Sequence, residues 1–248
     1  MEKDAKDYRK DELKSYVIGN ILIILASTGN LAQFMHSSTG TDIVGLLKVF
    51  ISSALFSSIL YIYIFLIDAV VPGKLKDIIV WAFTGKPGNT IFSRILTKNK
   101  DDRFTVDQAS KAYKNIYSEI KLLQGKEKEN KENAEWYRLY KHHEKHAEIL
   151  GVQKDFLLCR DMMTMTIISA LGYLCLLWYL RQEISWILMM IFLLEFIVTW
   201  LAAKVKAERW AYNVIAIDIV EKDDERLQKE RVKEERKKEE KPEIVISK

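Results

Sequence analysis

Hydrophobic residues are concentrated in three long blocks of this chain, at positions 16–35, 43–71 and 162–203, and charged residues dominate the rest. A soluble domain would instead spread its apolar residues at the periods of amphipathic helices or strands. The third block is interrupted by the polar turn 181–185, which divides it into two arms. Because roughly 20 apolar residues cross a bilayer as a helix, the pattern predicts four transmembrane helices in two hairpins.

Lysine and arginine are distributed unevenly among the segments that connect these blocks. Segments 1–15 and 204–209 and the stretch after Pro72 are rich in both residues, whereas the turns 36–42 and 181–185 share a single arginine. Cytoplasmic loops of membrane proteins carry the excess of positive charge. We therefore expect a multi-pass membrane protein with both termini and the central polar domain in the cytoplasm.

The polar segments between and after the hairpins are expected to form helices on the cytoplasmic side. Helix 104–124 would begin with a capping box of Thr105 and Gln108, and a second helix would cover 134–150. No proline separates position 152 from the third span, and the fourth span likewise continues into a polar extension. The expected fold is all-α, with these segments: 1–71, the first hairpin (spans at about 16–35 and 43–71); 72–161, a cytoplasmic helical domain; 162–203, the second hairpin; 204–248, a helical extension with a charged tail.

Two shorter segments complete this picture. Segment 74–83, KLKDIIVWAF, carries Trp81 and Phe83 and forms either an interfacial helix or a helix packed on the soluble domain. Segment 125–133, GKEKENKEN, is expected to be a charged connector between the two cytoplasmic helices.

The composition, 49% hydrophobic and 29% charged with a formal net charge of +4, gives no reason to expect a nucleic-acid partner. Cys159 and Cys175 lie at the edge and inside of one apolar arm, so we expect apolar packing rather than a disulfide. The sequence has no nucleophile elbow, no H-E-x-x-H motif and no carboxylate pair in a plausible cleft. Neither an enzyme nor a bound cofactor is expected.

Glu195 is the most conspicuous candidate residue, because it interrupts the apolar run FLLEFIVTW of the fourth span. A carboxylate at this depth costs about 3 kcal/mol or more unless it has a partner or a purpose. Lys48, Asn20 and Asn30 are possible partners from the first hairpin. Glu195 therefore either lines a pore or subunit interface, or forms hydrogen bonds inside the bundle. The serine-rich face of the second span, which includes Ser53 and Ser57, is a second candidate for such a surface.

The cytoplasmic domain offers a candidate ligand or partner site. Arg138 could bind a phosphate while neighbouring aromatic rings stack on a base. The alternative is architectural: the aromatic rings pack a helical hairpin, and an Arg-Asp pair marks the membrane interface. The residues concerned are Trp136, Arg138, Tyr140, Arg160 and Asp161.

Three histidines at the end of the second cytoplasmic helix raise the question of a metal site. His142 and His146 have the i,i+4 spacing of two imidazole ligands, but no nearby acidic or thiol ligand has suitable local spacing. The neighbouring Lys141 and Lys145 would repel a cation. A solvated basic face, which includes His143, is favoured, and no metal site is expected.

Two blocks of the sequence carry a resemblance to a known group of proteins. They are N-A-E-W-Y-R-L-Y-K at 133–141 and F-L-L-C-R-D at 156–161. The chain resembles a family of uncharacterised small bacterial membrane proteins that share N-x-x-W-Y-R-L-Y-K and F-L-L-x-R-D blocks between pairs of transmembrane helices. Segment 87–95, P-G-N-T-I-F-S-R-I, is similar to a further family segment, although Asp102 replaces the proline that follows it there. The resemblance implies four spans, and proteins of this architecture occur as membrane effectors of bacterial defence.

These observations favour one functional hypothesis and leave one alternative. The favoured hypothesis is a bacterial membrane effector or sensor, plausibly in anti-phage defence, whose cytoplasmic domain receives a partner or ligand. Its spans would assemble into a homo-oligomer in the lipid bilayer and perturb or permeabilise it. The alternative is a non-catalytic membrane anchor or scaffold that recruits a cytoplasmic protein through 104–150 and the charged tail.

Overall fold

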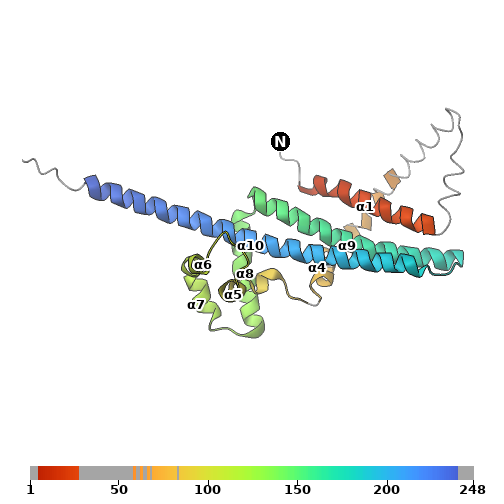
Figure 1. The fold of residues 1–248 in the computed structure, drawn as a ribbon, viewed down its shortest axis with the longest axis horizontal. Helices are drawn as coiled ribbons and strands as arrows, with labels where there is room; N and C mark the ends of the chain where they lie inside the picture. Colours follow the sequence, from red (N-terminus) through yellow and green to blue (C-terminus); the bar gives the residue numbers. More distant parts are fainter. Residues whose placement is uncertain are drawn as a thin grey trace, which may run out of the picture. The chain divides into compact units, whose positions relative to one another are not determined.

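The computed structural model describes residues 5–27, 58–59, 62–63, 66–67, 69–82 and 84–239. Every regular element within these ranges is helical, which confirms the all-α prediction for this part of the chain (Figure 1). The elements are α1 (Ala5–Ser27), α4 (Gly73–Trp81), the 3-10 turn η1 (Pro87–Asn89), α5 (Ile91–Thr97), α6 (Val106–Ala112), α7 (Lys114–Ile120), α8 (Gly125–His143), α9 (Ala147–Leu180) and α10 (Trp186–Glu239).

The chain divides into two compact units. The first unit comprises Met1–Gly85 and Leu150–Ala207, and the second comprises Lys86–Ile149 and Glu208–Lys248. Both α9 and α10 therefore contribute residues to each unit, whereas the hydropathy pattern suggested divisions at the ends of the apolar blocks.

Two helices are long and apolar enough to cross a membrane, α9 over Ala147–Leu180 and α10 over Trp186–Lys233, judged by length and composition. The short connection 181–185 joins them, and the stretches that flank it lie side by side (Figure 1). The prediction that both arms continue as helix beyond 162–203 is confirmed, because α9 begins at Ala147 and α10 ends at Glu239. Only 17% of the most apolar stretch of α10 is buried within the chain. The helix therefore presents a large apolar surface for lipid or for another protein.

In the first unit, α1 packs along the α9–α10 hairpin. The contacts form two apolar clusters. The cluster around Ile24 includes Tyr173, Leu177, Leu188 and Phe192. The cluster around Val17 includes Leu13 and Met165. Of the first predicted span, the structure describes residues up to Ser27, and most of the second predicted span lies outside the described residues.

Helix α4 also belongs to the first unit and contacts both arms of the hairpin. The indole of Trp200 donates a hydrogen bond to the carbonyl of Val80 at 3.2 Å, and Trp81 stacks on Phe156 with ring centroids 6.0 Å apart. Helix α4 thus packs on both α9 and α10. Phe83, which the sequence placed at the membrane surface, lies outside the described residues.

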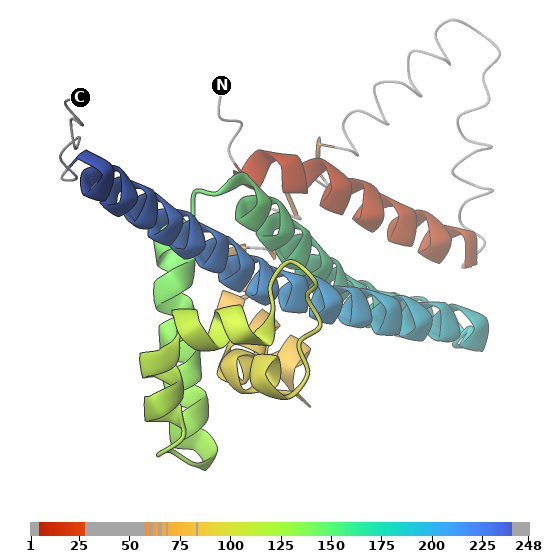
Figure 2. The same ribbon diagram turned by 60° about the vertical axis from the view of Figure 1, so that its left-hand side comes forward.

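The second unit has its own apolar core, built by α5 to α8 and by the part of α10 that follows residue 207. Figure 2 shows the short helices of this unit beside α10. The predicted capping box is confirmed, since Thr105 and Gln108 make both of its hydrogen bonds at the start of α6. The prediction of one helix over 104–124 is wrong. Tyr113 departs from helical geometry, with φ −118° and ψ 28°, and separates α6 from α7. Its buried hydroxyl donates to Asp218 at 2.7 Å, a tertiary contact that outweighs helix propensity.

Two boundaries around α8 also differ from the prediction. Segment 125–133 is helical instead of a connector, because α8 begins at Gly125. Within it, Glu132 is buried and accepts hydrogen bonds from the backbone N–H and the hydroxyl of Ser93, so this part of the helix is held against α5. The predicted helix 134–150 ends at His143, and a turn over 144–146 precedes α9.

Candidate functional site

Glu195 lies where three helices of the first unit meet. The hydroxyl of Tyr16, on α1, donates to Glu195 Oε2 at 3.0 Å and also lies 2.7 Å from the hydroxyl of Thr166 on α9. The buried side-chain amide of Asn20 contacts both carboxylate oxygens, at 3.2 and 2.9 Å, in the orientation in which its nitrogen donates. The carboxylate is thus surrounded by neutral hydrogen-bond donors, which offset part of the cost of removing it from water.

This arrangement selects one partner from those that the sequence offered. Asn20 was a candidate, and it contacts Glu195 directly. Tyr16 was not a candidate, although its position exactly one helical turn before Asn20 places both side chains on the same face of α1. The other candidates, Lys48, Asn30, Ser53 and Ser57, lie outside the described residues.

A second polar cluster of the first unit joins α4 to α9. Lys76 Nζ lies 3.3 Å from Asp161 Oδ1, and both side chains are almost completely buried. Arg160 lies 2.9 Å from Asp77 and 3.3 Å from Asp161. Asp161 therefore pairs with both Lys76 and Arg160, and Arg160 also pairs with Asp77. Burying charges is tolerated only when they are paired and hydrogen-bonded, so these contacts give the R-D of the F-L-L-x-R-D block an architectural role.

The five residues proposed as a ligand site are divided between the two units. Trp136 and Tyr140 are buried in the core of the second unit, where their rings stack on each other and both meet Trp210 edge-to-face at 5.1 Å. Arg138 is exposed and pairs with Glu135 at 2.8 Å. Arg160 and Asp161 belong to the first unit. Aromatic stacking on a base is therefore not available to Trp136 and Tyr140.

Arg138 does contribute to a small basic hollow of about 230 Å³ in the second unit. Besides Arg138, three lysines line it, namely Lys111, Lys114 and Lys222, and no acidic residue does. The remaining lining residues are Ala112, Tyr113, Asn115 and Ile116. Lys222 is partly neutralised by Asp218 at 2.7 Å and lies 4.5 Å from the centre of the Tyr113 ring.

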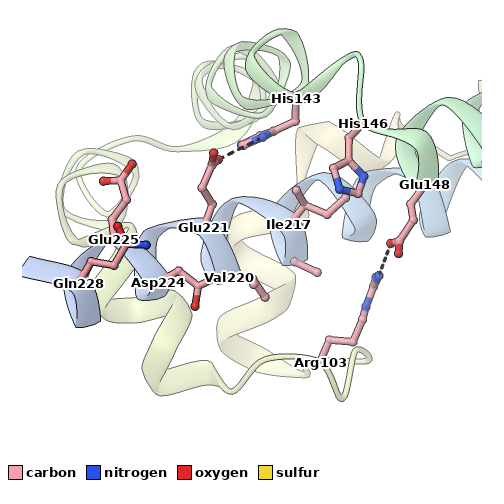
Figure 3. Close-up of a pocket in the computed structure, with 11 residues that line it drawn as sticks. Arg103, His143, His146, Glu148, Ile217, Val220, Glu221, Asp224, Glu225 and Gln228 are labelled. Carbon is pink, nitrogen blue, oxygen red and sulfur yellow. Dashed lines mark ion pairs between the residues drawn. The ribbon is translucent and has the colours of Figure 1, made fainter. Parts of the chain in front are cut away.

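A larger open groove of about 570 Å³ lies beside α10 in the second unit (Figure 3). Four carboxylates and three cationic or imidazole side chains line it: Glu148, Glu221, Asp224 and Glu225, with Arg103, His143 and His146. Figure 3 shows His143 directed at Glu221 and Arg103 directed at Glu148. The corresponding distances are 3.4 Å from His143 Nδ1 to Glu221 Oε2 and 3.7 Å from Arg103 to Glu148.

The expectation of a solvated histidine face is wrong for His143. Its side chain is buried, and its Nε2 lies 3.0 Å from Asp218 Oδ1. His142 and His146 are exposed. Sequence spacing could not reveal this, because the acidic partners Asp218 and Glu221 lie on α10, far from the histidines in the chain.

Asp218 connects the groove to the basic hollow. Burial acts to raise the pKa of its carboxyl, but hydrogen bonds from Lys222, Tyr113 and His143 outweigh burial and hold that pKa below its usual value. Burial, followed by the charge of Asp218, raises the pKa of the Tyr113 hydroxyl, which therefore remains a neutral donor. Asp218 is thus a carboxylate that accepts three hydrogen bonds in a buried position.

Comparison with known proteins adds no family assignment: no family model, no curated protein and no solved structure matches this chain. Functional inference therefore depends on the geometry of these sites.

Proposed function

We propose that this chain is a multi-pass membrane protein that acts as an effector or sensor in the bacterial inner membrane. In this proposal four spans form two hairpins, both termini and the second unit are cytoplasmic, and the second unit binds a ligand or protein. The spans then assemble as a homo-oligomer and perturb the bilayer. The proposal includes no catalytic step, and anti-phage defence is a plausible setting because of the resemblance in the W-Y-R-L-Y-K and F-L-L-x-R-D blocks.

The observation that carries the proposal is the environment of Glu195. A carboxylate within an apolar helix is costly, so its presence implies a use. Here the neutral donors Tyr16 and Asn20 join α1 to the Glu195 carboxylate of α10 by hydrogen bonds. Such contacts can be exchanged for equivalent contacts with water or with another subunit at modest cost. We call this contact between α1 and α10 the polar seam. A membrane-perturbing effector requires a closed helix bundle that can open along such a contact.

The exposed apolar surface supports the oligomer in this proposal. Within the part of the chain that the structure describes, large apolar side chains of α10 remain exposed, among them Trp186, Ile187, Met190, Leu194 and Val198. In this proposal the second unit receives the ligand or partner, because residues of α10, the helix that also carries Glu195, line its groove.

Membrane potential tests the proposal. Expression of the chain in bacterial cells, with a potential-sensitive dye as the readout, is expected to cause depolarisation. Glu195→Gln and Glu195→Ala are expected to change its extent, because each alters the polar seam. Thr199→Val, which removes a hydroxyl bonded only to backbone carbonyls of the same helix, serves as the control and is expected to behave like the parent. Unchanged potential at high expression of every variant would contradict the effector hypothesis.

The anchor or scaffold hypothesis remains the alternative, and one observation favours it. The final part of α10, from Glu221 onward, is a largely exposed helix of alternating charge. None of its described residues belongs to the apolar core of the second unit, in which Ile219 is the residue nearest the C-terminus. A scaffold would retain the membrane potential and would lose its protein partner when residues 222–248 are removed.

A further inference from the structure

We propose that His142, His143 and Glu221 bind a divalent transition-metal ion, with Zn²⁺ the best match, at one end of the groove in the second unit. One potential ligand atom from each residue lies within 4.8 Å of the others. The two histidines end α8 and Glu221 lies on α10, so the ion would join two helices. This inference concerns binding alone and does not depend on the proposed membrane activity.

The hydrogen bonds of His143 define which ring nitrogen is available. Asp218 is a carboxylate and can only accept, so the His143 nitrogen beside it, Nε2 at 3.0 Å, carries the hydrogen. In the neutral ring the other nitrogen, Nδ1, then presents a lone pair. That lone pair faces Glu221 Oε2, another acceptor, at 3.4 Å. A cation shared between Nδ1 and the carboxylate satisfies both atoms.

The distances match zinc coordination. Zn–N and Zn–O bonds of about 2.0–2.2 Å in a tetrahedron place neighbouring ligand atoms about 3.3–3.5 Å apart. The 3.4 Å between His143 and Glu221 meets this requirement without any movement. A nitrogen of the exposed His142 lies within 4.8 Å of the other two ligand atoms, so its side chain must move closer before it can bind the same ion. Three protein ligands leave one position open toward the groove for water or a further ligand.

Asp218 supplies the outer support that such sites use. A metal-bound histidine almost always donates its other N–H to a carboxylate or carbonyl, which fixes the ring and strengthens the ligand. Asp218 does this for His143 and is itself held by Tyr113 and Lys222, each at 2.7 Å. These contacts therefore hold the His143 ring in one orientation before a metal ion binds, and the burial of the ring restricts which other groups it can contact.

The donor set and the nearby charges indicate the class of metal. Two imidazoles and one carboxylate suit Zn²⁺, Ni²⁺, Co²⁺ or Cu²⁺ rather than Mg²⁺ or Ca²⁺, which prefer oxygen ligands alone. The repulsion that Lys141 suggested from sequence is reduced, because its ammonium group pairs with Glu144 at 2.7 Å. Asp224 and Glu225 add negative charge to the groove.

Calorimetric titration of the purified, tag-free, full-length protein with Zn²⁺ after chelator treatment tests the site. We expect one ion per chain. His142→Ala and Glu221→Gln should each weaken binding at least tenfold, and Asp218→Asn should weaken it by roughly 10–100-fold through the loss of support for His143. His142 and Glu221 are exposed side chains outside the apolar core, so their replacement leaves the fold intact, which circular dichroism would verify.

Two neighbouring variants provide matched controls. His146→Ala and Glu225→Gln remove an imidazole and a carboxylate that line the same groove but do not belong to the triad. Both should bind Zn²⁺ with parental affinity. Absence of binding by the parent protein, or equal affinity of the parent, His142→Ala and Glu221→Gln, would overturn the proposal. Loss of binding in both controls as well would assign the ion to the groove as a whole and would also overturn it.

Discussion

At the scale of single residues, the second unit depends on a few close contacts between segments distant in sequence. Gly88, in η1, lies against α8 so closely that an added Cβ would be 2.8 Å from Asn133 Oδ1 and 2.9 Å from Trp136 Cε3. The P-G and N-x-x-W residues of the sequence blocks therefore share one packing contact, which explains why a residue without a side chain occupies position 88.

Gly88→Ala should destabilise the second unit by about 1–3 kcal/mol, because neither a helix-bound indole nor Asn133 can retreat without disturbing the core. Tryptophan fluorescence during thermal unfolding would report it. Gly151→Ala is the matched control: its Cβ meets nothing within 4 Å and it lies in the helix α9, so it should be neutral or slightly stabilising. Equal effects of the two substitutions would contradict the packing argument.

Asp101 provides a pH-dependent contribution at the same scale. Burial acts to raise the pKa of its carboxyl, but hydrogen bonds from the side chain and backbone of Arg103 outweigh burial and lower that pKa. A carboxyl whose pKa is lower in the folded than in the unfolded protein stabilises the fold at pH values above its unfolded pKa. That stabilisation is lost as the pH falls through the folded pKa.

Asp101→Asn should therefore lower the unfolding temperature near pH 7, and the difference from the parent should shrink below about pH 4. Thermal unfolding of both proteins across this range would measure it. The exposed neighbour Asp102→Asn tests for a general charge effect and should show no such convergence. A difference between parent and Asp101→Asn that stays constant with pH would refute the assignment.

At the scale of helices, polar side chains determine which apolar helices associate. Leucine and isoleucine cannot distinguish lipid from another helix, so hydrogen bonds and close packing must provide the selectivity. In the first unit, Tyr16 and Asn20 of α1 contact Glu195 of α10, and Tyr16 also contacts Thr166 of α9. In the second unit, Asp218 does the same for α8 and for the Tyr113 junction between α6 and α7.

A double-mutant cycle between Tyr16→Phe and Glu195→Gln should reveal coupling of about 0.6–1.7 kcal/mol, the range found for hydrogen bonds between membrane helices. Unfolding in mixed detergent micelles would provide the four free energies. Tyr179→Phe combined with Glu195→Gln is the control, because Tyr179 is exposed on α9. Its coupling energy should be zero. Additive effects of Tyr16→Phe and Glu195→Gln would show that their contact contributes nothing.

At the scale of the whole molecule, α9 and α10 define how the chain would cross a membrane. Both cysteines are free, Cys159 half-buried and Cys175 exposed, which confirms that no disulfide joins them. Along the sequence, the connection 181–185 lies at one end of the apolar stretches of α9 and α10, and the boundaries with the second unit, at 149/150 and 207/208, lie at the other. The proposed topology places that connection outside the cell and the second unit inside.

Labelling with a membrane-impermeant maleimide tests this topology. In a background with Cys159→Ser and Cys175→Ser, Glu183→Cys should react in intact cells. Lys128→Cys, at a partly exposed position of α8, should react only after the cells are permeabilised. The background protein alone should not react under either condition. Equal reactivity of Glu183→Cys and Lys128→Cys in intact cells would rule out a membrane between the two positions.

The sequence by itself determined the helical class, the two long apolar helices on either side of 181–185, the capping box of Thr105 and the anomaly at Glu195, because each depends on local periodicity, capping chemistry or hydropathy. It could not determine which side chains meet across helices. The break at Tyr113, the burial of Glu132 and His143, and the grouping of His142, His143 and Glu221 all depend on partners from other elements. Only the tertiary structure decided these, because burial and hydrogen bonding between distant segments outweigh the small free energies of local propensity.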